Sequence, residues 1–352
     1  MDAPHLIVEV RLGPRRGTKA VLRPGEALAV GRSDLADLAV PEDASLSPRH
    51  FELRWDGARS RLRDLGGRGG TRLNGEPVTD AEVPHGGWIR AGGNDFTVYV
   101  EGHTPPAPVE DDPPDPPDAE DDDAEPEGAP AFAAEPVEPS PEDEPEDADE
   151  REERLRFQAA HQVERRQERR GREARAEAAA RALPILQAVA EESALHAVLD
   201  AARAPRILEV LREAIEDHRS LYEGAQGTAL EEVAPYLVRL APGSRLLAQL
   251  TGEGWMRRWG IFAEGTVPRR ELRRHFRRFL MVEDESGAPL YFRFYDPGVL
   301  RDFWPSCARR QLVDLLGPLR AFLVEGERGE VLRLTATGKV EPWSGPLLAG
   351  SG

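Results

Sequence analysis

A run of arginines in the C-terminal third is the clearest group of side chains that could bind a partner. Six arginines fall within ten residues, at positions Arg269, Arg270, Arg273, Arg274, Arg277 and Arg278. Leu272, Phe276 and Leu280 recur among them at helical spacing, which predicts a helix over residues 268–280 with one buried apolar face. The opposite face is basic and suits an acidic surface on a partner.

Other polar groups indicate structural roles and not catalysis. Asp296 precedes Pro297, and this pair is typical of a helix N-cap followed by the first helical residue. Arg293 lies between two phenylalanines on a predicted strand (290–295), where it can pair with a carboxylate such as Asp296 or with one from a partner. The sequence has one cysteine, no histidines four residues apart and no phosphate-binding loop. We therefore expect no catalytic residue, no metal site and no cofactor.

The net charge of −18 comes from one segment. Residues 110–150 contain 20 Asp or Glu and no Lys or Arg, so the remaining chain carries a net charge of +2. Residues 103–150 are also rich in proline and have one aromatic side chain, Phe132. Such a composition cannot bury enough apolar surface to fold, which predicts a disordered acidic linker over 103–150. It could act as a spacer or mask a basic surface such as 268–280.

Residues 151–192 are predicted to form a charged, basic helical segment. Arginine and glutamate alternate densely with alanine up to residue 182, and Pro184 is expected to break the helix. We expect no nucleic-acid binding, because the segment lacks interleaved aromatics and adjoins the acidic linker. No uncharged apolar stretch approaches the ~20 residues that span a bilayer, so we expect no membrane insertion. One cysteine and a start without signal-peptide character indicate a cytoplasmic protein.

Residues 1–102 have the pattern of an all-β sandwich, because short alternating apolar runs are separated by turn residues. These runs cover residues 6–10, 19–22, 27–30, 51–55, 61–65, 88–90 and 96–100. The loops between them contain Gly31-Arg32, Ser47-Pro48-Arg49-His50, residues 64–71 (Asp-Leu-Gly-Gly-Arg-Gly-Gly-Thr) and Leu73-Asn74-Gly75. This set of motifs resembles the forkhead-associated (FHA) domain, a phosphothreonine-binding β-sandwich.

The FHA resemblance implies a phosphopeptide site on the loops. Arg32 and Ser47 would hold the phosphate, Arg49 and Arg68 could add charge, and His50 would brace the binding loop. Residues 67–71 depart from the Ser-x-Asn-Gly-Thr sequence that is usual in the family, since both the Ser and the Asn positions are glycine. That Asn would clasp the peptide backbone. The loops therefore either bind phosphothreonine with altered affinity or serve an unphosphorylated partner.

Residues 193–335 alternate helical and strand patterns, which predicts an α/β domain. The expected strands cover 195–199, 236–240, 259–263, 290–295, 319–325 and 331–334, and the expected helices cover 205–218, 268–280, 299–304 and 310–316. Residues 336–352 are rich in Gly and Pro and are predicted to be a flexible tail.

Several motifs of this domain occur in a characteristic order. They are Ala-Pro-Tyr-Leu-Val (234–238), Trp-Gly-Ile-Phe (259–262), Leu-Arg-Arg-His-Phe-Arg-Arg-Phe-Leu (272–280), Phe-Arg-Phe-Tyr-Asp-Pro (292–297) and Leu-Gly-Pro (316–318). Together they closely resemble the effector-chaperone (adaptor) domain of bacterial type VI secretion systems. The resemblance implies a non-enzymatic domain that binds an effector protein and helps load it onto a spike (VgrG-like) protein. Gly298 stands where many relatives have Arg, which could alter the choice of partner.

These observations favour an adaptor. The C-terminal domain would hold an effector, with Arg293 and the six arginines of 268–280 as candidate partner-binding residues. The N-terminal domain would dock on the secretion machine or bind a phosphothreonine-containing protein. The alternative is a phosphothreonine-dependent signalling scaffold without effector cargo.

Overall fold

The structure, a computed structural model, describes residues 3–106, 148–283 and 287–345. Most of the predicted disordered linker and the end of the predicted tail therefore lie outside the described residues. The chain divides into two units, one formed by Met1–Pro105 with Arg175–Gly352 and the other by Pro106–Ala174.

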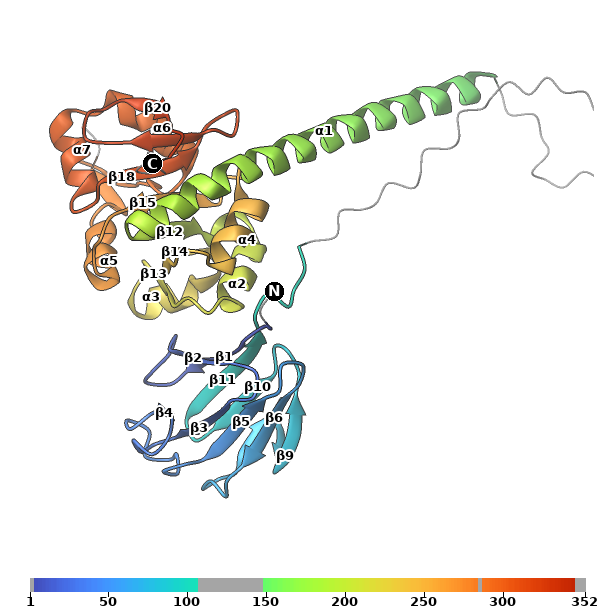
Figure 1. Cartoon of the computed structure of the whole chain (residues 1–352). Coiled ribbons are helices and arrows are strands. Elements are labelled where there is room, and N and C mark those ends of the chain that lie inside the picture. The colour runs from blue at the N-terminus through green and yellow to red at the C-terminus, as the bar shows by residue number, and fades with distance from the viewer. Residues whose placement is uncertain (1–2, 107–147, 284–286, 346–352) are drawn as a thin grey trace, which may run out of the picture. The chain divides into compact units, whose positions relative to one another are not determined.

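The N-terminal domain is a β-sandwich, as its alternating pattern predicts (Figure 1). Its strands are β1 (Leu6–Leu12), β2 (Lys19–Leu22), β3 (Ala27–Gly31), β4 (Leu38–Ala39), β5 (Phe51–Trp55), β6 (Ser60–Asp64), β7 (Thr71–Leu73), β8 (Glu76–Val78), β9 (Asp80–Val83), β10 (Trp88–Ala91) and β11 (Asn94–Val100). Within the described residues they form a six-stranded sheet, β2-β1-β11-β10-β7-β8, and a five-stranded sheet, β4-β3-β5-β6-β9.

The two-residue period of the sequence fills the core of this sandwich. In β5, Phe51, Leu53 and Trp55 are buried, while Arg54 between them is exposed. Phe51 also packs edge-on against Phe96 of the other sheet, with ring centroids 5.4 Å apart. Because successive side chains of a strand point to opposite faces, this alternation commits one face of each sheet to the core and leaves the loops free for binding.

The C-terminal domain is built on an antiparallel sheet. Its strands are β12 (Leu195–Asp200), β13 (His218–Ser220), β14 (Pro235–Leu240), β15 (Gly260–Glu264), β18 (Ala321–Glu325), β19 (Val331–Leu334) and β20 (Val340–Pro342), and a separate hairpin contains β16 (Met281–Glu283) and β17 (Pro289–Tyr291). The helices are α1 (Ala148–Glu192), α2 (Pro205–Arg212), α3 (Gly224–Ala229), α4 (Arg245–Gly254), α5 (Arg269–Arg277), α6 (Pro297–Phe303) and α7 (Arg309–Leu316). In the described chain the main sheet has seven strands in the order β13-β14-β12-β15-β18-β19-β20.

Helices cover both faces of this sheet and give three layers. Ala197 and Leu199 of β12 point into a core shared with α1, α2 and α4, whereas Val198 points into a second core shared with α5, α6 and α7. The strands are therefore apolar on both sides, and all six residues of β12 are buried. The predicted α/β class is confirmed.

Helix α1 runs through Pro184 without ending, so the predicted break at this residue is wrong. A proline in a helix interior removes one backbone hydrogen bond and costs about 3 kcal/mol. The same region of α1 buries Ala182, Leu186 and Val189 against the sheet. Burial of this apolar face stabilises the helix enough to offset the proline.

Three other sequence predictions differ from the structure. The helix predicted over 205–218 ends at Arg212 and leaves Ile215 exposed, because His218 pairs with Val238 as the first residue of β13. The strand predicted over 290–295 ends at Tyr291, and the chain then turns into α6. The predicted flexible tail contributes β20, which pairs with β19.

Candidate functional site

Loops beside β3 and β5 bring together three of the residues predicted to bind phosphate. The backbone amide of Arg32 donates to the carbonyl oxygen of Ser47 (2.9 Å), and that of Arg68 donates to the Oγ of Ser47 (2.8 Å). The Arg32 and Arg68 side chains are exposed, and within the described residues neither makes an ion pair. A hydroxyl between two arginines that are free to move towards it can hold a dianion through charge-assisted hydrogen bonds.

Gly31 and His50 hold these loops together. A Cβ at position 31 would lie 2.2 Å from the carbonyl oxygen of Pro48, so only glycine permits this close approach of the two loops. His50 is fully buried, and its Nδ1 accepts from the Ser47 amide (3.2 Å) while its Nε2 lies 3.2 Å from the carbonyl oxygen of Gly70. His50 is therefore a bracing residue and does not face the site.

The glycines of residues 67–71 differ in what they permit. A Cβ at Gly67 would lie 2.3 Å from Cδ2 of His50, so the serine that is usual in FHA domains fits only if the ring moves. Gly69 has a φ of +85° and nothing within 4 Å of its Cβ position, so asparagine, which tolerates this backbone region, has room there. Arg49 is exposed, and its Nη2 lies 3.7 Å from Oε2 of Glu52, so its charge is partly compensated by that carboxylate.

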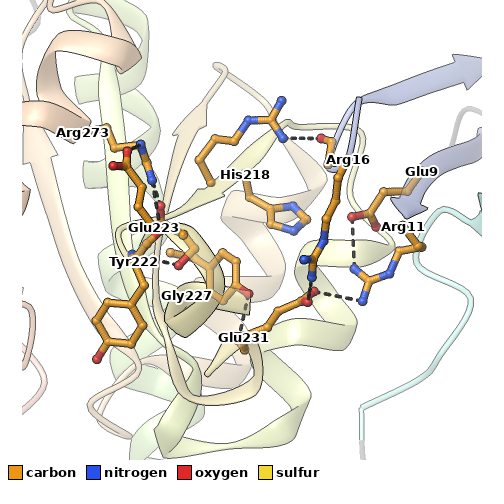
Figure 2. A pocket seen from close by; sticks show the side chains of 14 residues that line it. Glu9, Arg11, Arg16, His218, Tyr222, Glu223, Gly227, Glu231 and Arg273 are labelled. Carbon is orange, nitrogen blue, oxygen red and sulfur yellow. Dashed lines mark hydrogen bonds and ion pairs between the residues drawn. The ribbon is translucent and has the colours of Figure 1, made fainter. Parts of the chain in front are cut away.

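The six arginines of α5 and its C-cap residue, Arg278, separate into two stripes. The inner stripe, Arg269, Arg273 and Arg277, is half-buried and is used within the domain. Arg269 pairs with Asp217, and Arg277 pairs with Glu223. Arg273 donates from Nε to the carbonyl oxygen of Ser220 (2.6 Å), from Nη2 to that of Tyr222 (3.1 Å), and from Nη1 to Glu223 (2.5 Å), as Figure 2 shows in part. Burial lowers the pKa of Arg273, with Arg269 adding to the shift. These three residues fix α5 to residues 217–223, which contain β13 and the chain on either side of it.

The outer stripe, Arg270, Arg274 and Arg278, is exposed. Arg278 donates from Nη2 to Nδ1 of His275 (2.8 Å) and lies over the ring of Phe279. Arg270 and Arg274 have no ion-pair partner in the described part of the chain. A hollow with a volume of about 420 Å³ runs along α5 between these arginines and Glu223. Of the six arginines predicted to form the basic face, only the three of the outer stripe are exposed, and the other three are used within the domain.

Arg293 joins a network of arginines and aspartates at the end of β12 and the start of α6. It pairs with Asp200, and Arg203 pairs with Asp296. Asp296 is 1% exposed and caps α6 by accepting from the amide of Gly298 (2.9 Å), which agrees with its predicted N-cap role. Burial opposes ionisation of Asp296, but hydrogen bonds from Arg258 and Arg203 outweigh it and lower the pKa.

Gly298 leaves space for another arginine. The guanidinium of Arg258 donates to Oδ1 of Asp296 from Nε (2.9 Å) and Nη2 (2.6 Å). A Cβ at Gly298 would lie 2.7 Å from Nη2 of Arg258. The absence of a side chain at position 298 therefore gives the Arg258 guanidinium the room that it occupies beside Asp296.

A buried glutamate supports the loop that carries Arg258. Arg258 and Met256 both have positive φ, +58° and +61°. The Arg258 amide donates to Oε1 of Glu325 (2.9 Å), and the Met256 amide donates to Oε2 of the same carboxyl group (2.5 Å). Burial raises the pKa of Glu325 to about 7, against the effect of these two hydrogen bonds. The carboxyl group of Glu325 thus holds two residues in a strained backbone region.

A cavity of about 280 Å³ contains further charged groups (Figure 2). Arg11 and Arg16 both pair with Glu231, Arg11 at 2.9 Å. His218 is buried beside them, and burial holds its pKa well below the ordinary value, so the ring is neutral. Arg11 and Arg16 are already paired within the chain. The cavity is therefore less suited to an acidic ligand than the loop site or the outer stripe, where the arginines are exposed.

The described residues contain no group of three or more His, Cys, Asp and Glu side chains that could hold a metal ion. Among the described helices, none is both long enough and apolar enough to cross a membrane.

A sandwich with binding loops joined to a domain with an exposed basic stripe defines a modular interaction protein. Two family matches make this specific. Residues 28–92 match the FHA domain, and residues 195–314 match the family described as Domain of unknown function (DUF4123). The chain thus carries an N-terminal FHA domain and a C-terminal DUF4123 domain, which confirms the two domain resemblances read from the sequence.

Similar proteins match the FHA region. The chain is 35% identical over 93 residues to the FHA domain-containing protein FhaA of Mycobacterium tuberculosis, covering 26% of this chain and 17% of FhaA. It is 31% identical over 86 residues to the glycogen accumulation regulator GarA of Mycolicibacterium smegmatis, covering 24% of this chain and 53% of GarA. A solved structure from a study of phosphothreonine-dependent FHA domain interactions is 31% identical, with a TM-score of 0.25, and covers 29% of this chain and 99% of that one. The chain thus spans less than two thirds of the curated relatives' length.

Proposed function

We propose that this protein is a cytoplasmic, non-enzymatic adaptor of a type VI secretion system. Its DUF4123 domain binds an effector and helps load it onto a spike protein, and its FHA domain binds a phosphothreonine-containing component. The match of residues 195–314 to DUF4123 carries this proposal, because those residues contain four of the five motifs that resemble the effector-chaperone domain.

The outer stripe of α5 supports a binding role for the C-terminal domain. Three exposed arginines at helical spacing, Arg270, Arg274 and Arg278, outnumber the one exposed carboxylate of the same helix, Glu271, so this face of α5 is basic. Arginine is enriched in protein interfaces and recognises carboxylates through paired hydrogen bonds. A partner with an acidic surface is the ligand that this stripe suits.

The loop site supports a phosphate-binding role for the FHA domain. Ser47 lies between the backbones of Arg32 and Arg68, and both guanidinium groups are exposed. The absence of an asparagine at position 69 removes one contact to the peptide backbone and leaves the phosphate contacts in place. We expect weak binding that depends on the phosphate.

Co-expression of the full chain with the protein encoded beside it tests the adaptor role. The two proteins should purify together at low salt. Reversal of charge in Arg270→Glu with Arg274→Glu should reduce recovery of the partner, and Arg310→Glu is the matched control because Arg310 is an exposed arginine on another helix, α7. Failure of the unaltered chain to retain the adjacent protein would contradict the proposal.

The alternative function is a phosphothreonine-dependent scaffold without cargo, which the loop geometry favours independently of the DUF4123 domain. It predicts tight binding of a phosphothreonine peptide that Arg32→Ala abolishes, together with no retention of the adjacent protein. Titration of phosphorylated and unphosphorylated forms of one peptide into the full chain separates the two functions.

A further inference from the structure

The hairpin formed by β16 and β17 directly follows the outer stripe of α5 in the chain and exposes apolar side chains. Met281 is 52% exposed, Leu290 51% and Tyr291 42%. In the described chain these strands pair only with each other, so both outer edges of the hairpin lack a partner strand. Exposed apolar side chains on an unpaired strand form a docking surface for an extended segment of another protein.

Contacts at its base fix the hairpin to the domain. The amide of Phe292 donates to the carbonyl oxygen of Leu280 (3.0 Å), which closes the hairpin just below its exposed residues. Phe292 packs edge-on against Phe303, with ring centroids 4.9 Å apart. The hydroxyl of Tyr291 lies 3.1 Å from that of Tyr295, whose side chain is buried. The apolar side chains are therefore presented on a supported strand pair, which lowers the entropy lost on binding.

The charged residues Arg278 and Glu283, near the two ends of β16, indicate which kind of segment can bind. Arg278, the last arginine of the outer stripe, lies three residues before Met281, so the basic stripe leads into the apolar hairpin. Glu283 is exposed at the far end of β16 and would repel an acidic residue there. An extended segment with acidic residues at one end and apolar residues at the other fits this order of charges, with its acidic end at α5.

We propose that the outer stripe and the β16–β17 hairpin form one docking surface for an extended acidic and apolar segment of the effector. This inference rests on the proposed adaptor function and names the chemistry of its ligand. The arginines pair with carboxylates of the segment. Met281 and Tyr291, which are opposite each other and share one face of the hairpin, and Leu290, which lies on the other face, bury its apolar side chains when the segment lies along the hairpin edge.

A synthetic peptide tests the surface directly. The probe is a fluorescein-labelled peptide with a block of Glu and Ser followed by a block of Leu, Phe and Ser. Two comparison peptides carry Lys in place of Glu or Ser in place of Leu and Phe. Fluorescence polarisation with the full chain should show saturable binding of the first peptide alone. Absence of that binding, or equal binding of either comparison peptide, would overturn the proposal.

Variants locate the binding on the chain. Met281→Ser with Leu290→Ser should weaken binding about tenfold or more, the change expected when about 1.4 kcal/mol of contact is lost. Arg274→Glu should weaken it and reduce its dependence on salt. Val313→Ser, which alters an apolar residue that is 48% exposed on α7, should leave binding unchanged. Unchanged binding by the Met281 and Leu290 double variant would refute the role of the hairpin.

The same variants separate this inference from the adaptor proposal. If the double hairpin variant retains the adjacent protein in co-purification as well as the unaltered chain does, the docking surface is wrong and the adaptor function stands. If the unaltered chain binds the probe peptide but not the adjacent protein, the surface stands and the adaptor function is wrong.

Discussion

Substitution of Gly298 by alanine tests how the arginine and aspartate network at α6 is assembled. The added Cβ would lie 2.7 Å from Nη2 and 2.9 Å from Cζ of Arg258, so the guanidinium must move. Arg258 would then lose its two hydrogen bonds to Oδ1 of Asp296. Asp296 keeps its contacts with Arg203 and with the amides of Gly298 and Val299, so its charge stays partly compensated.

The expected destabilisation is modest. A hydrogen bond to a charged group contributes about 1.5–3 kcal/mol. The Arg258 side chain is 47% exposed, so solvent screening reduces its share of the interaction. Alanine is also favoured over glycine in a helix by about 0.5–1 kcal/mol, which opposes the loss. We expect Gly298→Ala to lower the free energy of unfolding by about 1 kcal/mol, which corresponds to a fall of about 2–4 °C in Tm for a domain of this size.

A double-mutant cycle isolates the steric cause. Thermal unfolding of the full chain is followed by tryptophan fluorescence for Gly298→Ala, Arg258→Ala and the double variant. Once Arg258 is shortened, Gly298→Ala should be neutral or stabilising. Gly252→Ala is the control, because Gly252 lies in helix α4 and its Cβ position has nothing within 4 Å. If Gly298→Ala lowers Tm equally with and without Arg258, the steric explanation is refuted.

Three further predictions concern separate parts of the chain. Gly69→Asn should increase affinity for a phosphothreonine peptide several-fold and leave the unphosphorylated peptide unbound, as measured by calorimetric titration; equal affinity in both chains would contradict the proposed backbone contact. Glu325 has a pKa raised to about 7, so its native state holds the proton more tightly than the unfolded chain, and the free energy of unfolding should fall as pH rises from about 4.5 to about 7. Glu325→Gln should flatten that fall in urea unfolding, and an unchanged pH profile would refute it. Pro184→Ala should raise stability by up to about 3 kcal/mol, because it restores a helical hydrogen bond at an exposed position, and a lower Tm would count against this.

The sequence predicts those features of the fold that depend on local periodicity. Leu272, Phe276 and Leu280 are all buried, as their spacing indicates. The structural roles predicted for the Gly31-Arg32 turn and for His50 agree with the structure, because a close backbone approach and a buried bracing ring require these residue types. Local pattern and tertiary packing agree at these positions, so sequence alone was sufficient.

The division of the arginines on α5 could not be predicted in the same way. Arg269 and Arg273 differ from Arg270 and Arg274 only in the neighbours that the fold gives them. The carboxylates of Asp217 and Glu223 come from a segment about fifty residues earlier in the chain. The local sequence pattern does not predict this contact. Helical periodicity gives a basic face, but the pairing of its inner edge depends on tertiary structure.

Packing also overrides local signals elsewhere. Ile215 continues the helical repeat of α2, yet strand pairing at His218 stops the helix before it. Arg258 lies forty residues before Gly298, so the sequence does not reveal that these two residues meet beside Asp296.

The burial of the last turns of α1 determines where this protein can be cut. A fragment that begins at residue 193 would lack Ala178, Ala182, Leu186 and Val189 and would expose the apolar surface that they cover on β12, β14 and α4. Such a fragment should aggregate. A fragment that begins at or before residue 175 keeps the α1 residues that cover this apolar surface. Expression of the isolated C-terminal domain therefore requires the end of the charged helix as part of the folded domain.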